Sequence, residues 1–125
     1  MVSITVGTDL VEIARLKEAL GAGGSKLRTR LFTERELTYC RARTGEAGSL
    51  AVRFAAKEAV RKIFGQWGFD DVVWRETEIV NSDNGAPAVE LHGTAADRAQ
   101  GFCFALSLSH TEHYAQAFCV AYKEE

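Results

Sequence analysis

The sequence predicts an α+β fold, because helical patterns dominate the first half of the chain and strand patterns dominate the second half. The strongest helical pattern runs from Ser49, which is placed to cap it, to Gly65, which is placed to end it. Phe102–Ser109 and Tyr114–Tyr122 alternate as strands do, and the turn HTEH between them favours an antiparallel pair. We therefore expect one domain, residues 1–125, with an antiparallel sheet packed against a long amphipathic helix.

The first third of the chain is predicted to hold a strand and two helices. Val2–Gly7 has the alternation of a strand. A helical pattern follows over Val11–Leu20 and is closed by the glycine-rich stretch GAGG. Thr33 and Glu36 have the spacing of a capping box, which predicts a helix from there to about Arg43.

The segment after the long helix is predicted to form a hairpin and a short helix. Trp74–Val80 has the composition of a strand, and Asn81–Gly85, with the sequence NSDNG, is a strong turn signal. Ala88–Leu91 then returns as the second strand. Thr94–Gln100 is expected to be a helix that ends at Gly101.

The composition is that of an ordinary folded protein, with 46% hydrophobic residues, 26% charged residues and a formal net charge of −2. This balance gives no reason to expect a nucleic acid or a membrane as partner, so phosphate binding would require a local basic patch. The N-terminus lacks the pattern of a signal peptide, and no apolar run has the length of a membrane span. Cys40, Cys103 and Cys119 lack the spacing of metal or redox motifs, so we expect three reduced thiols in a cytoplasmic protein.

The segment RFAAKEAVRKIFG carries several charges on a helix whose other side is apolar. On a helical wheel, the apolar side consists of Val52, Ala55, Ala56, Ala59, Val60 and Ile63. Arg53, Lys57 and Arg61 form one row on the opposite side. Glu58 and Lys62, one helical turn apart, form the next row.

Two interpretations of this charged face stay open. In the first, the face is solvated and Glu58 simply pairs with Lys62. In the second, the basic residues bind a polyanion and Glu58 binds its divalent cation, because Mg²⁺ is usually held by one or two carboxylates together with phosphates and waters. Phe54 lies between the charged rows, which indicates that a neighbouring subunit or a ligand covers its ring.

A second oxygen ligand for such a cation is available in the segment GTDLVEI. Asp9 is expected where the first strand ends and the next helix begins, so that its side chain projects over a cleft. Glu12 is a weaker candidate one helical turn further on. Alternatively, Asp9 serves only as the N-cap of that helix.

A third candidate element is the segment LSLSHTEHY. Ser107 and Ser109 share one face of the predicted strand, and His110 stands at its end. His110 and His113 could suggest a pair of metal ligands, but no acid or cysteine lies at ligand spacing. A turn or an anion contact is therefore the favoured interpretation.

The segments GTDLVEI, RFAAKEAVRK and SLSHT, in this order and at these separations, closely resemble the holo-acyl-carrier-protein synthases, the small 4′-phosphopantetheinyl transferases. The NSDNGAP hairpin is also similar, and the similarity extends from Val2 to about Val120. The resemblance implies an enzyme that moves the 4′-phosphopantetheine arm of coenzyme A to a serine of an apo acyl carrier protein, releasing adenosine 3′,5′-bisphosphate. It also implies a 4′-phosphopantetheinyl transferase-like fold and a homotrimer with active sites in the clefts between subunits.

The resemblance implies roles for individual residues as well. Asp9 and Glu58 match the magnesium ligands of the family, and Glu58 and Lys62 are the expected catalytic residues. The base that takes the serine proton stays open between a metal-held water, which is preferred, and Glu58. Positions near the bound nucleotide and its phosphates are matched by Arg53, Lys57, Lys62, Ser109, His110 and Thr111.

The first helix departs from the family pattern, which commonly places several arginines there to meet the acidic helix of the carrier protein. Arg15 matches such a position and Lys17 lies near it, but GAGG occupies the place of further basic residues. The following turn offers substitutes in Lys26, Arg28 and Arg30. The choice between a carrier of fatty-acid biosynthesis and one of a secondary pathway therefore stays open.

Two other functions are weighed against the transferase. The first is a non-catalytic coenzyme A or carrier-protein binding module that kept the fold. The second, less favoured, is a pyrophosphatase-like hydrolase that releases nucleotide without a carrier. The presence of Asp9, Glu58 and Lys62 together favours the transferase, because decay of an active site removes costly charged ligands first.

Overall fold

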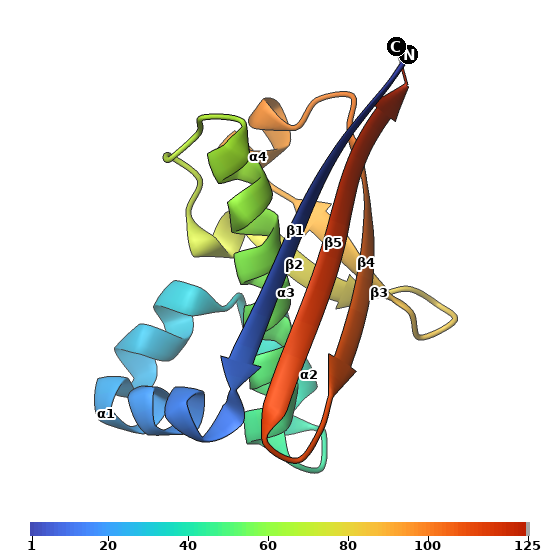
Figure 1. Cartoon of the computed structure of the whole chain (residues 1–125). Coiled ribbons are helices and arrows are strands. Elements are labelled where there is room, and N and C mark those ends of the chain that lie inside the picture. Colours follow the sequence, from blue (N-terminus) through green and yellow to red (C-terminus); the bar gives the residue numbers. More distant parts are fainter. Residues whose placement is uncertain (125) are drawn as a thin grey trace.

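The fold is α+β, as expected, with helices and strands mixed along the chain (Figure 1). The structure, a computed structural model, describes residues 1–124. The elements in chain order are β1 (Val2–Glu12), α1 (Ile13–Leu31), α2 (Glu34–Arg41), α3 (Glu46–Gln66), the 3-10 helix η1 (Trp74–Glu76), β2 (Thr77–Asn81), β3 (Pro87–Leu91), α4 (Gly93–Arg98), β4 (Cys103–His110) and β5 (Tyr114–Glu124).

A three-stranded antiparallel sheet in the order β1-β5-β4 forms one layer, and α3 packs against one of its faces (Figure 1). β1 and β5 pair over their full lengths, from Val2 opposite Glu124 to Glu12 opposite Tyr114. β2 and β3 form a separate two-stranded hairpin. Long strands at both ends of the chain thus hold the sheet together, and α3 is the helix that it supports.

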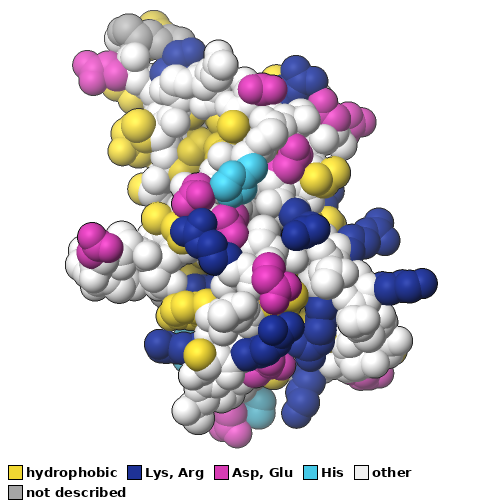
Figure 2. All heavy atoms as spheres, turned by 180° about the vertical axis from the view of Figure 1, so that it is seen from behind, with side chains coloured by type: hydrophobic (Ala, Val, Ile, Leu, Met, Phe, Trp, Pro, Cys, Tyr) yellow, Lys and Arg dark blue, Asp and Glu magenta, His cyan; other side chains and the backbone are white. Residues whose placement is uncertain are grey.

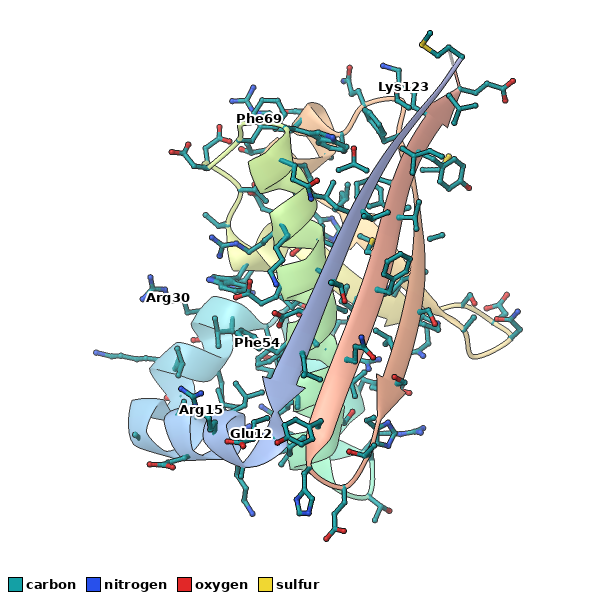
Figure 3. The ribbon with its side chains drawn as sticks, viewed as in Figure 1. Glu12, Arg15, Arg30, Phe54, Phe69 and Lys123 are labelled. Atoms are coloured by element: carbon teal, nitrogen blue, oxygen red, sulfur yellow. The ribbon has the colours of Figure 1, made fainter. Side chains whose placement is uncertain are left out.

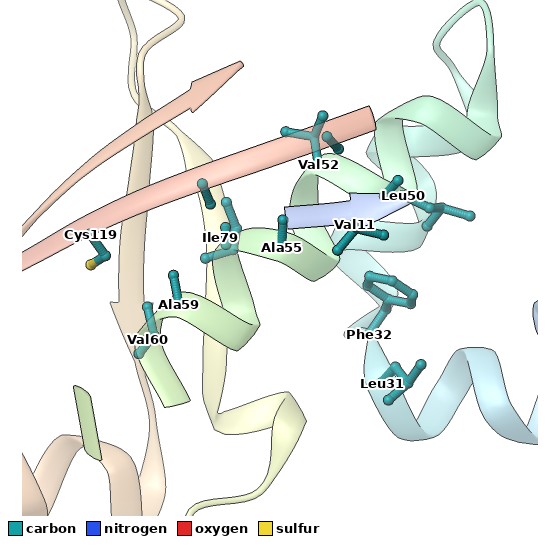
Figure 4. Packing of buried hydrophobic residues seen from close by; sticks show 14 of the residues in the cluster. Val11, Leu31, Phe32, Leu50, Val52, Ala55, Ala59, Val60, Ile79 and Cys119 are labelled. Atoms are coloured by element: carbon teal, nitrogen blue, oxygen red, sulfur yellow. The ribbon is translucent and has the colours of Figure 1, made fainter. Parts of the chain in front are cut away.

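The core lies between α3 and the sheet and is built largely from small side chains (Figure 4). The predicted apolar side of the helix is confirmed, since Ala55, Ala59 and Ile63 are completely buried. β5 faces it with Ala115, Ala117, Cys119 and Ala121, which are all completely buried as well. Small residues on both sides let the helix backbone approach the strands closely.

The closest approach between helix and sheet occurs at Gly7. A Cβ atom at this position would lie 2.0 Å from the carbonyl oxygen of Ala59. Since no side chain can be accommodated at that distance, only glycine allows β1 to rest directly on α3. Hydrogen bonds from the helix extend this contact, because Gln66 Nε2 donates to the Val6 carbonyl (2.7 Å) and Trp67 Nε1 donates to Thr5 Oγ1 (3.0 Å).

Several boundaries differ from the predictions. β1 continues past Gly7 to Glu12, because residues 8–12 pair with β5 instead of starting a helix. α1 runs through the GAGG stretch, with a kink at Gly24, where φ is +63°. α3 has Gly45 rather than Ser49 as its N-cap and passes Gly65 before it ends.

The capping box that starts α2 is confirmed. The backbone N–H of Glu36 donates to Thr33 Oγ1 at 3.2 Å, and the backbone N–H of Thr33 donates to Glu36 Oε1 at 2.9 Å. The helix ends at Arg41, two residues before the predicted end. Further on, Trp74 begins a 3-10 helix, so the strand predicted from that residue starts only at Thr77.

Phe54 is partly covered by its own chain, and the expectation that a ligand or a neighbouring subunit covers it stays a prediction. The ring of Phe54 stacks on that of Trp74, with 5.3 Å between centroids. Trp74 lies beyond the end of the helix, so the helical wheel gave no sign of this contact. The three thiols are free, as expected: Cys40 and Cys119 are buried and Cys103 is exposed.

The face of the sheet that points away from α3 is apolar and exposed. Ile4 is 64% exposed and lies opposite Tyr122, and Thr8 lies opposite the half-exposed Phe118. The large exposed apolar side chains of the two paired strands are Val2, Ile4, Val6, Leu10, Tyr114, Phe118 and Tyr122. A contiguous apolar surface of this kind is typical of an interface. Within residues 1–124, no helix combines the length and apolar character needed to cross a bilayer.

Candidate active site

Asp9, Glu58 and Lys62 meet where β1 rests on α3. Asp9 shares with Gly7 the face of β1 that points to the helix, and Lys62 Nζ donates to Asp9 Oδ1 at 3.1 Å and to the Thr8 carbonyl at 2.8 Å. Glu58 lies one turn earlier on α3. Burial raises the pKa of the Glu58 carboxyl and the nearby Asp9 carboxylate raises it further, while Arg61 and Lys62 lower it.

This group of side chains has the composition of a magnesium site. Two carboxylates lie close enough for one to disfavour ionisation of the other, which leaves negative charge that a divalent cation would offset. Oxygen ligands from one or two carboxylates are what Mg²⁺ takes from proteins, with phosphates and waters filling its other positions. Asp9 and Glu58 therefore fit the ion that the sequence led us to expect.

Asp9 reaches this place from within a strand rather than from a strand end. It pairs with Ala117 in the β1–β5 ladder, so it is not the cap of a helix. Glu12, the weaker candidate, is the last residue of the same strand and is exposed. Since side chains alternate between faces along a strand, Glu12 projects to the face opposite that of Asp9 (Figure 3).

Arg53 lies in a different part of α3 and is almost entirely buried, with 5% of its surface exposed. Its Nη2 donates to Asn81 Oδ1, and its guanidinium lies over the ring of Tyr39, with Cζ 3.9 Å from the centroid. Its Nε–H has no hydrogen-bond partner among the described residues. A buried cationic donor without a partner is costly, so this position is suited to receive an anion.

The Arg53 guanidinium lines a pocket of about 420 Å³ between the start of α3, the β2–β3 hairpin and β4. Arg43 and His110 also line it, as do the glycine-rich first turn of α3 and Asn81. Two basic side chains and the N-terminus of a long helix give the pocket a positive character. Three residues that line this pocket were not predicted from the sequence: Tyr39, Arg43 and Asn81. The only signal for them was the glycines and serine of GEAGS, close to Arg43.

The three residues of the Ser-His-Thr segment lie in different surroundings. His110, the last residue of β4, lines the pocket. Ser109 is exposed and pairs with Gln116 in the sheet. Thr111 closes the turn after β4, where its backbone N–H donates to the Tyr114 carbonyl at 2.8 Å and its Oγ1 accepts from the Tyr114 N–H at 3.2 Å. The predicted turn is confirmed by this pair of hydrogen bonds.

Lys57 does not lie on an exposed row of the helix, and this expectation is wrong. Its side chain is completely buried, where Nζ donates to Glu36 Oε1 at 2.7 Å and to the Thr77 carbonyl at 3.0 Å. Burial lowers the pKa of the Lys57 ammonium, and Glu36 opposes this shift. The helical wheel failed here because α2 and β2 cover this side of α3.

A second group of possible metal ligands, Glu78, Glu90 and His92, lies on and beside the β2–β3 hairpin. His92 Nε2 is 3.0 Å from Glu78 Oε1. The guanidinium of Arg35 is 3.3 Å from each of the two carboxylates, so a side-chain cation already offsets part of their charge. None of these residues matches a ligand expected from the sequence.

The cluster of Asp9, Glu58 and Lys62 lies on a different side of α3 from the Arg53 pocket. Arg53 and Glu58 are five positions apart, which on a helix corresponds to about 140° of rotation. Neither Asp9, Glu58 nor Lys62 lines the pocket. One chain thus presents two partial sites rather than a single complete one.

Comparison with known proteins shows the family to which the chain belongs. The family model of the 4′-phosphopantetheinyl transferase superfamily matches residues 5–119. The chain belongs to this superfamily. It is 44% identical over 119 residues to a holo-[acyl-carrier-protein] synthase of Desulforudis audaxviator, covering 93% of this chain and 90% of the relative, and 40% identical to one of Ruminiclostridium cellulolyticum, covering 92% and 89%.

Solved structures of the superfamily share the whole fold. A Chronobacterium ammoniagenes ACPS–CoA complex superimposes with a TM-score of 0.87 at 32% identity, covering 98% of this chain and 99% of that one. The holo-[acyl-carrier-protein] synthase of Helicobacter pylori in complex with coenzyme A gives a TM-score of 0.81 at 27% identity, covering 94% and 99%. The expected 4′-phosphopantetheinyl transferase-like fold is therefore confirmed.

Proposed function

We propose that this chain is a holo-acyl-carrier-protein synthase, which transfers the 4′-phosphopantetheine arm of coenzyme A to a serine of apo acyl carrier protein and releases adenosine 3′,5′-bisphosphate. The relatives named for this activity match nearly the whole chain, and related structures were solved with coenzyme A. The observation that carries the proposal is the meeting of Asp9, Glu58 and Lys62 between β1 and α3.

The reaction needs charge stabilisation at a pyrophosphate. The serine oxygen forms a bond to the β-phosphorus while the bond from that phosphorus to the bridging oxygen breaks, so negative charge builds on the departing nucleotide phosphate. Asp9 and Glu58 would hold magnesium here, and the ion would supply stabilisation for this negative charge. Lys62 is the catalytic residue beside them, and its half-exposed ammonium can turn from Asp9 to a phosphate oxygen. The base that takes the serine proton stays open between a metal-held water, which is preferred, and Glu58.

The nucleotide end of coenzyme A is assigned to the Arg53 pocket. The guanidinium of Arg53, which lines this pocket, would meet a phosphate of the nucleotide, and Arg43 and His110 would supply further contacts. Ser109, in β4, and Thr111, in the turn that follows, flank His110 and are assigned to this part of the site. Lys57 has no access to a ligand and is left out of the binding surface.

The two partial sites are completed, in this proposal, between chains of a homotrimer. The exposed apolar face of the sheet offers a surface that a second copy would cover. A neighbouring chain would then supply the Arg53 pocket to the Asp9 and Glu58 carboxylates. This arrangement accounts for the separation of the two halves on the flanks of α3.

The carrier protein is expected to dock on α1. Arg15 and Arg30 project from this helix away from the body of the molecule (Figure 3), and Figure 2 shows basic side chains gathered on the same side. Lys17 and Lys26 are exposed on α1, whereas Arg28 pairs with Glu46 at 3.3 Å. A basic surface of this kind is complementary to an acidic helix of a carrier. The enzyme would act in the cytoplasm, on a carrier of fatty-acid biosynthesis or of a secondary pathway.

The mass of the carrier protein tests the proposal directly. The chain is incubated with apo acyl carrier protein, coenzyme A and magnesium, and the carrier is weighed by intact-protein mass spectrometry. We expect the carrier to gain one phosphopantetheine arm, and to gain none when a chelator removes the magnesium. Binding of coenzyme A without any mass gain would favour the non-catalytic module, and release of nucleotide without a modified carrier would favour a hydrolase.

A further inference from the structure

Glu36 and Lys57 form an ion pair that is completely buried and takes no part in the proposed chemistry. Both side chains have no exposed surface, and Lys57 Nζ lies 2.7 Å from Glu36 Oε1. A buried ion pair contributes little net stability compared with well-packed apolar side chains, because both charges lose their hydration. Its presence in the core of a small domain therefore calls for another explanation.

The pair connects three elements that are far apart in the chain. Glu36 belongs to α2 and accepts from the Ile79 backbone N–H of β2 through Oε2, at 2.8 Å. Lys57 belongs to α3 and donates to the Thr77 carbonyl of β2 at 3.0 Å. The distance and direction between α2, α3 and β2 are thus set by hydrogen bonds of fixed geometry rather than by apolar contacts alone.

The same three elements supply the guanidinium of Arg53 and its two contacts. Arg53 belongs to α3. Its guanidinium lies over the ring of Tyr39, which belongs to α2, and donates a hydrogen bond to Asn81 Oδ1, which belongs to β2. Each of these three residues lies on the same element as a residue of the ion-pair network. The spacing between the two places them on the same face of that element. The spacings are three residues from Glu36 to Tyr39, four from Arg53 to Lys57, and two from Ile79 to Asn81.

The buried pair thus lies directly behind the anion-binding guanidinium. A shift of α2 or β2 against α3 would move Tyr39 or Asn81 away from Arg53, and these two contacts hold its guanidinium in place. Ordering an arginine side chain is costly in entropy, so a pre-formed cradle improves the affinity for its ligand.

We propose that Glu36 and Lys57 are positioning residues, which hold α2, α3 and β2 in the register that presents the Arg53 guanidinium to a phosphate group of the nucleotide. This proposal rests on the proposed function, because it assumes that the Arg53 pocket binds the nucleotide end of coenzyme A. It predicts that the pair controls nucleotide affinity through Arg53 and leaves the Asp9 and Glu58 carboxylates undisturbed.

A double-mutant cycle between Lys57 and Arg53 tests this dependence. The variants are Lys57→Met, Arg53→Ala and their combination, and the probe is adenosine 3′,5′-bisphosphate measured by isothermal titration calorimetry. We expect Arg53→Ala and Lys57→Met each to weaken binding by about tenfold. In the Arg53→Ala background, Lys57→Met should change the affinity by less than about twofold, because the residue through which it acts is gone. A full additional loss in that background would overturn the proposal.

Loss of stability alone is separated from positioning by two further variants. Glu36→Gln combined with Lys57→Met removes both charges and keeps a carbonyl oxygen for the Ile79 N–H. It should recover most of the melting temperature lost in Lys57→Met, but not the affinity. Val60→Ala, a core truncation on the same helix, should lower the melting temperature and leave the affinity unchanged. If the charge-free pair binds the nucleotide as tightly as the wild type, the proposal is wrong.

A measurement made without any ligand separates a failure of the positioning role from a failure of the proposed function. The ¹⁵N-detected Nε–H signal of Arg53, assigned by its absence in Arg53→Ala, should be distinct in the wild type and move to the position of a free arginine in Lys57→Met. This result is independent of nucleotide binding. Absence of nucleotide binding by the wild type would contradict the proposed function, whereas an unchanged Arg53 signal in Lys57→Met would contradict the positioning role.

Discussion

Two carboxylates and one ammonium, contributed by residues about 50 positions apart in the chain, form the reactive part of the site in the proposed function. We predict that Asp9→Asn and Glu58→Gln each lower metal-dependent transfer by about 100-fold or more, because either change removes an oxygen ligand of the magnesium ion. The melting temperature should stay near that of the wild type, since neither side chain packs in the core. Carrier mass and thermal unfolding measure the two quantities.

Glu12→Gln is the matched control for these variants. It removes the same charge from the same strand, but on the exposed face that points away from Glu58. Its transfer rate should equal that of the wild type. A rate as low as that of Asp9→Asn would contradict the assignment, because removal of a charge on either face of the strand would then have the same effect.

The buried cysteines provide a prediction about reactivity. Burial raises the pKa of the Cys119 thiol to about 12, and burial also raises the pKa of Cys40. Since only the thiolate reacts with alkylating reagents, both residues should stay unmodified by iodoacetamide at pH 8 in the native protein and react once urea unfolds it. Peptide mass spectrometry follows each site. Rapid native alkylation of Cys119 would contradict its place beneath α3.

At the scale of elements, the contact between β1 and α3 brings the carboxylates together, and Gly7 is its narrowest point. We predict that Gly7→Ala destabilises the protein by about 2 kcal/mol or more, because the added Cβ collides with the backbone of α3 and not with a movable side chain. Transfer activity should fall with it, since Asp9 moves away from Glu58. Chemical denaturation and the transfer assay provide the measurements.

Gly21→Ala is the comparison for this prediction. A Cβ at Gly21 would meet no atom within 4 Å, and the residue lies inside α1. Alanine is a better helix former than glycine, so this variant should be more stable by up to about 1 kcal/mol. Equal effects of the two substitutions would show that the strand and helix are not in close contact.

The sequence was sufficient for the elements whose pattern is local. The apolar side of α3 follows from helical periodicity, and the capping box of Thr33 and Glu36 needs only four consecutive residues. The turn after His110 was also predicted, because two alternating strands flank it. For the same reason, the three candidate segments could be identified before their arrangement was known.

The features that were not predicted from the sequence depend on contacts between residues far apart in the chain. Asp9 was expected at the start of a helix, but pairing with β5 keeps it in a strand. Lys57 was expected in solvent, but α2 and β2 enclose it and Glu36 neutralises it. A periodic pattern reports which side of a helix is apolar, not which neighbours cover the other side, so a buried charge pair and the Arg53 cradle were not predictable from it.

At the scale of the whole molecule, the apolar face of the sheet and the divided site lead to the same arrangement. We predict a homotrimer in multi-angle light scattering at micromolar concentration. Introducing charge with Ile4→Glu and Phe118→Glu should yield monomers, because a buried unpaired carboxylate cannot be accommodated at an apolar interface. The monomers should be folded by circular dichroism and inactive in transfer. Fully active monomers would contradict the shared cleft.

Mixing two impaired variants, assayed at coenzyme A concentrations well below the KM, tests most directly the claim that each active site is assembled from two chains. Asp9→Asn lacks the carboxylate half and Arg53→Ala lacks the pocket half, so a trimer that contains both has clefts with one intact half from each chain. Co-expression of the two in equal amounts should restore about one quarter of the wild-type transfer rate, which is the share of clefts with two intact halves after random assembly. Transfer by the mixture that stays as low as that of the separate variants would contradict the account, because the two halves would then have to belong to one chain.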